Sequence, residues 1–179
     1  LNVENCKITG NGKFSVVANP GGTTTKGAGI AIAQHTTKLP IDVKISSGKI
    51  TGASAVYESN PQKNGEDSIA KIKLSIVDGN FTGDIYSEDI TGFISGGLFS
   101  KRFKESYCET GLTVIDNTDE ATKESYPNTV GTIKANNAEK INEASKLGTN
   151  VTTVGANISG ENIKAAKDIA DSVTLPSKE

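Results

Sequence analysis

Residues 41–50 read IDVKISSGKI, residues 72–81 read IKLSIVDGNF and residues 90–99 read ITGFISGGLF, so one pattern occurs three times. Each copy has isoleucine at its first and fifth positions, glycine at its eighth and isoleucine or phenylalanine at its tenth. Before the glycine, apolar residues alternate with polar ones, which is the two-residue period of a strand with one buried face. The third copy is looser because glycine replaces the apolar residue at its third position. The pattern predicts short strands that each turn at a glycine.

The spacing of the copies indicates how these strands are arranged. Gly48 and Gly79 lie 31 residues apart, whereas Gly79 and Gly97 lie 18 residues apart. A tandem helical repeat keeps a constant period, but a coil of parallel strands lets extra residues leave as loops while the strands stay in register. Residues 58–68 (ESNPQKNGEDS) have the composition of such a loop. We therefore predict a mainly β fold, a right-handed parallel β-helix (solenoid), over residues 1–131.

The same residues carry a resemblance to a known family. Residues 94–100 (ISGGLFS) resemble the "isoleucine, serine, two glycines, any residue, phenylalanine, serine" repeat of pectin-lyase-like β-helices in large secreted surface proteins of bacteria. Residues 107–131 resemble the closing coil of such repeats, although Ser47 and Asp78 stand where the first two copies would need the first glycine. The resemblance implies the solenoid fold and a secreted or cell-surface location, and it says almost nothing about activity.

Beyond residue 131 the composition and the period change. Alanine and lysine become more frequent, Asn136 and Glu139 resemble a capping box, and apolar residues follow a helical period. A strand-like stretch at residues 151–154 precedes a second helical pattern at about residues 159–172. We expect residues 132–179 to form a small helix-strand-helix appendage, which either caps the solenoid or begins a following module.

Composition excludes several functional classes. Aromatic residues make up 5% of the 179-residue chain, tryptophan and methionine are absent, and the formal net charge is −2 with mixed signs. A chain without a basic field is a poor binder of nucleic acid. No apolar run approaches the ~20 residues of a membrane span. The chain begins at Leu1 without an initiator methionine or signal peptide, so we expect a fragment or mature form from which a secretion signal has been removed.

The two cysteines, Cys6 and Cys108, are far apart in the sequence. They would lie on different coils of a solenoid, so we favour two free, buried thiols over a disulfide, which the sequence leaves open. His35 is the only histidine and lies in an expected loop. With no second histidine and no nucleophile beside it, it offers neither a metal pair nor a catalytic triad.

The superfamily that this sequence resembles includes polysaccharide hydrolases and lyases, and the sequence contains candidate residues for each. Hydrolysis of a glycosidic bond needs two facing carboxylates, and Asp119 matches one family tripeptide by letter only, so we interpret it as a turn residue. Lyases use calcium and a basic residue, for which the candidates are the carboxylates of Asp84, Glu88 and Asp89 with the basic pair Lys101-Arg102 downstream. Because calcium needs six to eight converging oxygens, a solvated acidic corner is the simpler interpretation.

Tyr57 and Tyr86 occupy comparable places after their repeats, nine residues beyond Gly48 and seven beyond Gly79. If both point outward, they form an aromatic stripe on which sugar rings can stack; the alternative is that each covers the base of a loop. Residues 101–107 (KRFKESY) are charged, and we expect them to be helical for a turn or two.

The favoured hypothesis is a non-enzymatic, secreted or cell-surface module, a structural stalk or an adhesin with a glycan-binding face at Tyr57 and Tyr86. Its expected partners are carbohydrate or a host or cell-surface protein, with no catalytic residue and no nucleic acid. The alternative is a polysaccharide lyase or glycoside hydrolase, which would require Asp84, Glu88 and Asp89 to converge. Calcium would be the cofactor of a lyase. The oligomeric state is left open by the sequence.

Overall fold

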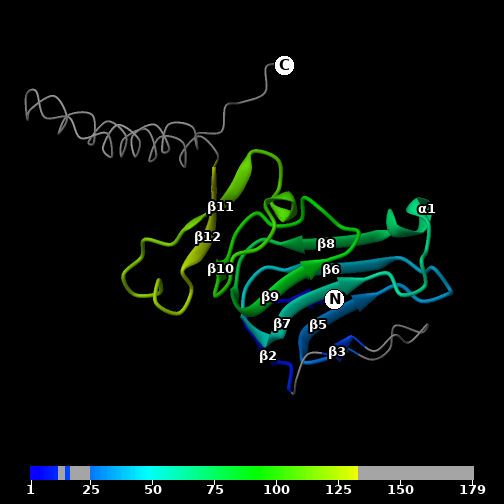
Figure 1. The fold of residues 1–179 in the computed structure, drawn as a ribbon, viewed down its shortest axis with the longest axis horizontal. Coiled ribbons are helices and arrows are strands. Elements are labelled where there is room, and N and C mark those ends of the chain that lie inside the picture. The colour runs from blue at the N-terminus through cyan, green and yellow to red at the C-terminus, as the bar shows by residue number, and fades with distance from the viewer. Residues whose placement is uncertain (12–14, 17–24, 133–179) are drawn as a thin grey trace, which may run out of the picture. The chain divides into compact units, whose positions relative to one another are not determined.

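In the computed structural model of the 179-residue chain, residues 1–11, 15–16 and 25–132 are described. All of these except the last two residues belong to one compact unit, Leu1–Val130. Strands predominate in this unit, in agreement with the expected mainly β class (Figure 1). The predicted domain boundary after residue 131 stays a prediction, because residues 133–179 lie outside the described part.

A three-stranded parallel sheet contains the first half of the first two copies of the repeat. Strands β1 (Asn2–Val3), β6 (Ile41–Ile45) and β8 (Ile72–Ile76) lie in the order β1-β6-β8. Strands β6 and β8 pair in the register set by the repeat, so that Ile45 lies beside Ile76. The third copy adds only a single parallel bridge, from Ile76 to Ile94.

A seven-stranded sheet contains the second half of each repeat, in the order β11-β12-β10-β9-β7-β2, and β5 also pairs with β7. Strands β5, β7 and β9 run side by side and parallel (Figure 1). On the other edge of β9, β10 is parallel to it, and β12 is antiparallel to β10. The bounds are β2 (Lys7–Thr9), β5 (Ala28–Ala33), β7 (Lys49–Ser59), β9 (Asn80–Ser87), β10 (Leu98–Phe99), β11 (Leu112–Asp116) and β12 (Asn128–Thr132). The remaining elements are the antiparallel pair β3 (Ser15–Val16) and β4 (Thr25–Lys26), helix α1 (Glu66–Ile69) and the 3-10 turn η1 (Glu105–Tyr107).

The core lies between the two sheets and is made of the apolar positions of the repeat. Because equivalent positions pair on neighbouring strands, like side chains stack on like. The rings of Phe81 and Phe99, both fully buried, stack with centroids 5.0 Å apart and an interplanar angle of 11°. Burying each such side chain contributes about 1.5–3 kcal/mol. The other fully buried repeat residues are Ile45, Ile50, Ile76 and Ile94.

The prediction of a right-handed parallel β-helix is wrong. A solenoid needs every coil to add a strand to each sheet, whereas the third copy contributes only the bridge at Ile94 and the two-residue β10. The chain then returns antiparallel through β12, and β3 and β4 are also antiparallel, so the described strands form mixed sheets. The repeat determines which residues lie side by side, but not the course of the chain after the last copy.

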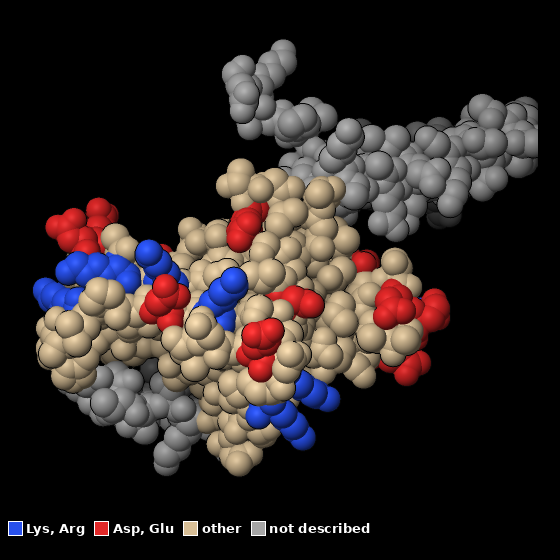
Figure 2. All heavy atoms as spheres, turned by 180° about the vertical axis from the view of Figure 1, so that it is seen from behind, with Lys and Arg blue, Asp and Glu red and all other residues tan. Residues whose placement is uncertain are grey.

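The predicted helix-strand-helix appendage at residues 132–179 falls outside the described residues, apart from Thr132. Within the described part the helical elements are α1 and η1, and no helix-strand-helix unit occurs there. No described helix has the length and apolar character needed to cross a membrane. Acidic and basic side chains are interspersed on the face seen in Figure 2, which fits the formal net charge of −2.

Both cysteines are free, as favoured from the sequence, but they differ in burial. Cys108 is buried, and desolvation raises the pKa of its thiol to about 11. Cys6 is exposed, so the expectation that both thiols would be buried holds for Cys108 alone.

Candidate functional site

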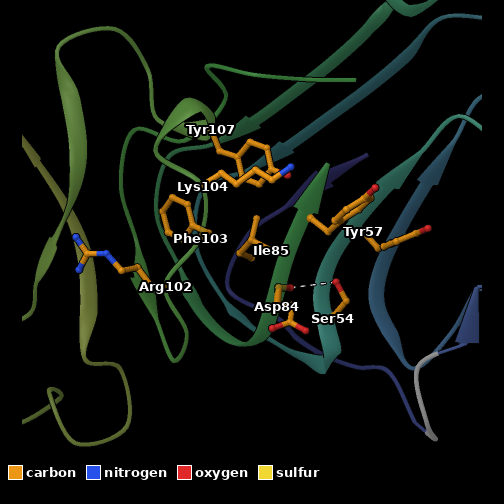
Figure 3. Close-up of a pocket in the computed structure, with 9 residues that line it drawn as sticks. Ser54, Tyr57, Asp84, Ile85, Arg102, Phe103, Lys104 and Tyr107 are labelled. Carbon is orange, nitrogen blue, oxygen red and sulfur yellow. Dashed lines mark hydrogen bonds between the residues drawn. The ribbon is translucent and has the colours of Figure 1, made fainter. Parts of the chain in front are cut away.

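A pocket of about 760 Å³ opens between β9 and the segment 102–107 (Figure 3). It gathers three of the chain's four tyrosines and one of its five phenylalanines, in a chain that is otherwise poor in aromatic residues. In Figure 3, Phe103, Lys104 and Tyr107 lie across the pocket from Tyr57, with Ile85 between them. The lining residues are Ser54, Tyr57, Asp84, Ile85, Tyr86, Arg102, Phe103, Lys104 and Tyr107.

Tyr57 and Tyr86 form one wall of the pocket. They are direct partners on the parallel strands β7 and β9, and their rings stack with centroids 5.1 Å apart and an interplanar angle of 16°. Tyr57 is 7% exposed and Tyr86 is 39% exposed, so Tyr86 presents the accessible ring. Burial raises the pKa of both phenols above 10.0, which keeps both rings neutral over the physiological range.

A local irregularity in β7 explains how two tyrosines at different distances from their glycines become partners. The register of β7 and β9 shifts after Thr51, which pairs with Thr82, and is regular again at Val56, which pairs with Ile85. Between these two pairs β7 advances five residues and β9 three, so the two extra residues of β7 form a bulge. This difference equals the difference between nine and seven residues in the sequence.

The opposite wall is held by the core and by hydrogen bonds. The Tyr107 hydroxyl donates to the carbonyl oxygen of Ser87 at 2.8 Å and accepts from the backbone N–H of Ser87 at 3.0 Å. The Tyr107 ring lies 5.2 Å from that of the buried Phe93. The rings of Phe103 and the buried Phe99 make a T-shaped contact with centroids 4.6 Å apart. Both aromatic residues of this wall are therefore fixed before any ligand enters.

The pocket lies where β9 no longer has β10 as a neighbour. Within β9 only Asn80 and Phe81, its first two residues, pair with β10, and beyond them side chains bond to this edge of β9. The Ser100 hydroxyl accepts from the N–H of Gly83 at 3.0 Å, and Tyr107 occupies the edge groups of Ser87. Backbone groups alternate in direction along a strand, so the N–H and C=O of Ile85 point to the same edge. Ile85 itself lines the pocket.

Two basic side chains line the pocket, and they differ in their partners. The Arg102 guanidinium donates to Asp116 at 3.4 Å and to the carbonyl oxygen of Val114 at 3.0 Å. The Lys104 ammonium instead lies over two ring faces, 5.9 Å from the centroid of Tyr86 and 5.7 Å from that of Tyr107. None of the ion pairs within the described residues involves Lys104.

The predicted calcium site at Asp84, Glu88 and Asp89 is not assembled. Asp84 lines the pocket, but Lys101 holds its carboxylate at 2.9 Å. The Glu88 carboxylate accepts from the backbone N–H of Asn60 at 2.8 Å, and all three acidic residues are exposed. No group of three possible ligands close enough for a metal ion occurs among residues 1–11, 15–16 and 25–132. Of the sequence-predicted site residues, the structure thus brings together the two tyrosines and Asp84.

Glu58, which the sequence placed in a loop, is a fully buried carboxylate at the end of β7. Its Oε2 accepts hydrogen bonds from the Ser87 hydroxyl at 2.7 Å and from the N–H groups of Glu88 and Asp89 at 3.0 and 3.1 Å. Its Oε1 is buried without a partner in the described part of the chain. Glu58 thereby fixes the chain at Ser87, the residue to which Tyr107 is bonded.

Two further candidates have structural roles. Asp119 accepts hydrogen bonds from the Thr122 hydroxyl at 2.7 Å and from the Ala121 N–H at 3.2 Å, which lower the pKa of its carboxyl. It is a turn residue, as predicted. His35 is exposed in a loop, as expected, and its Nδ1 lies 2.9 Å from the Thr36 hydroxyl.

The sequence missed the wall formed by Phe103, Lys104 and Tyr107. The prediction for residues 101–107 was a turn or two of helix, but only Glu105–Tyr107 form a 3-10 turn. The available signal was the alternation of aromatic and basic residues directly after the last repeat. No family model matches the chain, and no curated protein or solved structure does so either.

Proposed function

We propose that this chain is a non-enzymatic binding module of a secreted or cell-surface protein, and that its pocket binds a carbohydrate. The observation that carries the proposal is the stacked pair of Tyr57 and Tyr86 at the wall of the pocket, with one ring accessible. The apolar faces of sugar rings stack on such aromatic surfaces, while the sugar hydroxyls remain available for hydrogen bonds.

The polar groups around the aromatic wall support a hydroxyl-rich ligand. Tyr86 and Lys104 line the pocket and carry a hydroxyl and an ammonium group, with which sugar hydroxyls can form hydrogen bonds. Ligand pockets typically combine apolar walls with a few polar groups that fix orientation. The fixed positions of Phe103 and Tyr107 reduce the ordering cost of binding.

The carboxylates favour binding over cleavage. Acid–base hydrolysis of a glycosidic bond uses two carboxyl groups that flank the bond. Of the described residues, Asp84 is the one carboxylate that lines the pocket, and it is ion-paired with Lys101. Glu88 and Asp89 do not line the pocket.

Tyrosine fluorescence tests the proposal directly, because the chain contains no tryptophan and three of its four tyrosines line the pocket. Titration with a panel of acidic and neutral oligosaccharides is expected to change this fluorescence. Calorimetry of the same ligands measures the affinity, and chromatography of the mixtures detects any cleavage products. We expect binding without products.

Variants at Tyr86 locate the site. Tyr86→Ala is expected to weaken binding about tenfold, which is about 1.4 kcal/mol, whereas Tyr86→Phe keeps the ring and the affinity. Val77→Ala, which removes an exposed apolar side chain outside the pocket, is the matched control. Absence of binding throughout the panel would contradict the carbohydrate proposal and favour a structural stalk, and release of unsaturated or reducing products would favour the enzymatic alternative.

A further inference from the structure

We infer that the carbohydrate bound by this pocket carries an acidic group, a carboxylate or a sulfate ester, and that Lys104 is the residue that selects for it. This inference rests on the proposed function. It names the ligand class that the charge arrangement of the pocket favours.

Three neighbouring basic residues differ in their partners. Lys101 is paired with Asp84 at 2.9 Å and Arg102 with Asp116 at 3.4 Å, so a carboxylate opposes each of these charges. Lys104 is the member of this group without an acidic partner in the described part of the chain. Since the pocket's own carboxylate is already taken by Lys101, an incoming anion would meet a cation that has no other ion pair to break.

The Lys104 ammonium lies over the rings of Tyr86 and Tyr107, 5.9 and 5.7 Å from their centroids. Cation–π contacts of this kind stabilise by only about 0.5–1 kcal/mol at exposed sites. Hydrogen bonds between an ammonium and an anionic oxygen are roughly twice as strong as neutral ones. An acidic group therefore offers Lys104 a better partner than the rings do.

The contacts of an acidic sugar with Lys104 and with Tyr86 support each other. While Lys104 covers the Tyr86 ring, a sugar cannot stack on that face without displacing the ammonium. An acidic sugar draws the ammonium from the ring to its own charged group and so frees the face for stacking. A neutral sugar also displaces the ammonium but offers it no charged partner, so a neutral sugar binds more weakly.

The test compares ligands that differ only in charge. An oligouronide is paired with its carboxyl-reduced neutral counterpart, and a sulfated oligosaccharide with its desulfated form, so that the carboxylate and sulfate sources are separated. For the unmodified protein we expect binding about tenfold tighter for at least one acidic member than for its neutral partner, which is about 1.4 kcal/mol. Raised salt should reduce this preference, because part of it is electrostatic.

Variants of Lys104 assign the preference to that residue. Lys104→Met should abolish it while leaving the affinity for the neutral member equal or higher, and Lys104→Arg should retain it. Lys73→Met, an exposed lysine on β8, controls for the loss of one positive charge. Denaturant unfolding of each variant confirms that it is folded.

An NMR measurement provides a readout that does not depend on affinity. The ε-methylene protons of Lys104 should be shifted upfield by the two rings in the free protein, and this shift should disappear on addition of the acidic ligand. Equal affinity for both members of each pair, or an unchanged preference in Lys104→Met, would overturn the inference while the carbohydrate proposal stands. Failure of every ligand to bind would overturn both.

Discussion

Two stacked aromatic pairs in this chain have nearly the same geometry and opposite surroundings. Phe81 and Phe99 stack at 5.0 Å and 11°, and Tyr57 and Tyr86 stack at 5.1 Å and 16°. In each pair the two residues are direct partners on neighbouring parallel strands. The phenylalanine pair is fully buried, whereas Tyr86 is 39% exposed.

The difference lies in what covers each pair rather than in how it is built. The core and Phe103 cover the phenylalanine pair, whereas the tyrosine pair lies where β9 has lost its outer neighbour and the chain has opened a pocket. Parallel pairing thus makes stacked rings at both places, and the end of β10 decides which of them meets solvent. We expect the first pair to contribute to stability and the second to binding.

The largest effect is expected from breaking the buried pair. Phe99→Ala should lower the free energy of unfolding by about 3–5 kcal/mol, because it removes a fully buried ring and leaves a cavity beside Phe81 and Phe103. Urea unfolding followed by circular dichroism measures the change. Leu98→Ala, at a partly buried position in the same strand, should cost less. Equal losses for the two variants would mean that the core is not centred on the stack.

The bulge that aligns the tyrosine pair can be tested at Gly83. This residue has φ +116°, and an added Cβ would overlap with the carbonyl oxygen of Gly52 across the strand. Gly83→Ala should lower the free energy of unfolding by about 2–3 kcal/mol. Gly65→Ala, at a position with φ −76° and open space around it, should cost less than about 1 kcal/mol. A well-tolerated Gly83→Ala would contradict the close approach of β7 and β9 at the bulge.

Breaking the exposed pair should have a smaller effect on stability than on binding. Tyr86→Ala removes the stacking on Tyr57, and aromatic pairs contribute about 0.5–1.5 kcal/mol beyond their burial. We expect the free energy of unfolding to fall by about 1 kcal/mol and saccharide binding to weaken about tenfold, which is about 1.4 kcal/mol. Parallel unfolding and binding measurements on Tyr86→Ala and Phe99→Ala check the comparison. The hypothesis fails if Tyr86→Ala destabilises the protein as much as Phe99→Ala does.

The smallest expected effect is on the pH dependence of the free energy of unfolding. Of the two aromatic pairs, only the tyrosine pair has groups that titrate. Burial raises the pKa of Tyr57 and Tyr86 in the folded protein, so their contribution to stability is complete below about pH 10 and is lost as the pH rises further. Cys108 acts in the same direction between pH 9.0 and about 11. Unfolding measured across this alkaline range in Cys108→Ala, with and without Tyr57→Phe and Tyr86→Phe, separates the two sources. A phenylalanine double variant with the same alkaline loss would show that the tyrosines do not titrate as proposed.

The sequence predicted correctly which strand residues become neighbours, but not how the chain continues after the last copy of the repeat. The three aligned glycines indicate which isoleucines and phenylalanines become neighbours, because parallel strands keep equivalent positions side by side. The solenoid did not follow, because the third copy forms only a bridge at Ile94 and the short β10 before the chain reverses through β12. Such a reversal depends on contacts distant in sequence, which a local repeat does not encode.

The site was half visible for a related reason. Tyr57 and Tyr86 belong to the repeat frame, so their positions after Gly48 and Gly79 marked them as a pair. The opposite wall comes from a segment without a repeat, whose aromatic residues are placed by their contacts with Phe93 and Phe99. Glu58 was assigned to a loop because polar residues follow it in the sequence. It is buried because β7 extends to Ser59.

The double hydrogen bond between Tyr107 and Ser87 has a consequence for the kinetics of binding. The rings of Tyr107 and Phe103 are already held in place before the ligand binds. The side chain that has to move is that of Lys104. A rotamer change of an exposed side chain takes picoseconds to nanoseconds, far faster than diffusional encounter. Association should therefore proceed at the rate of encounter, and ligands of different affinity should differ in how long they stay.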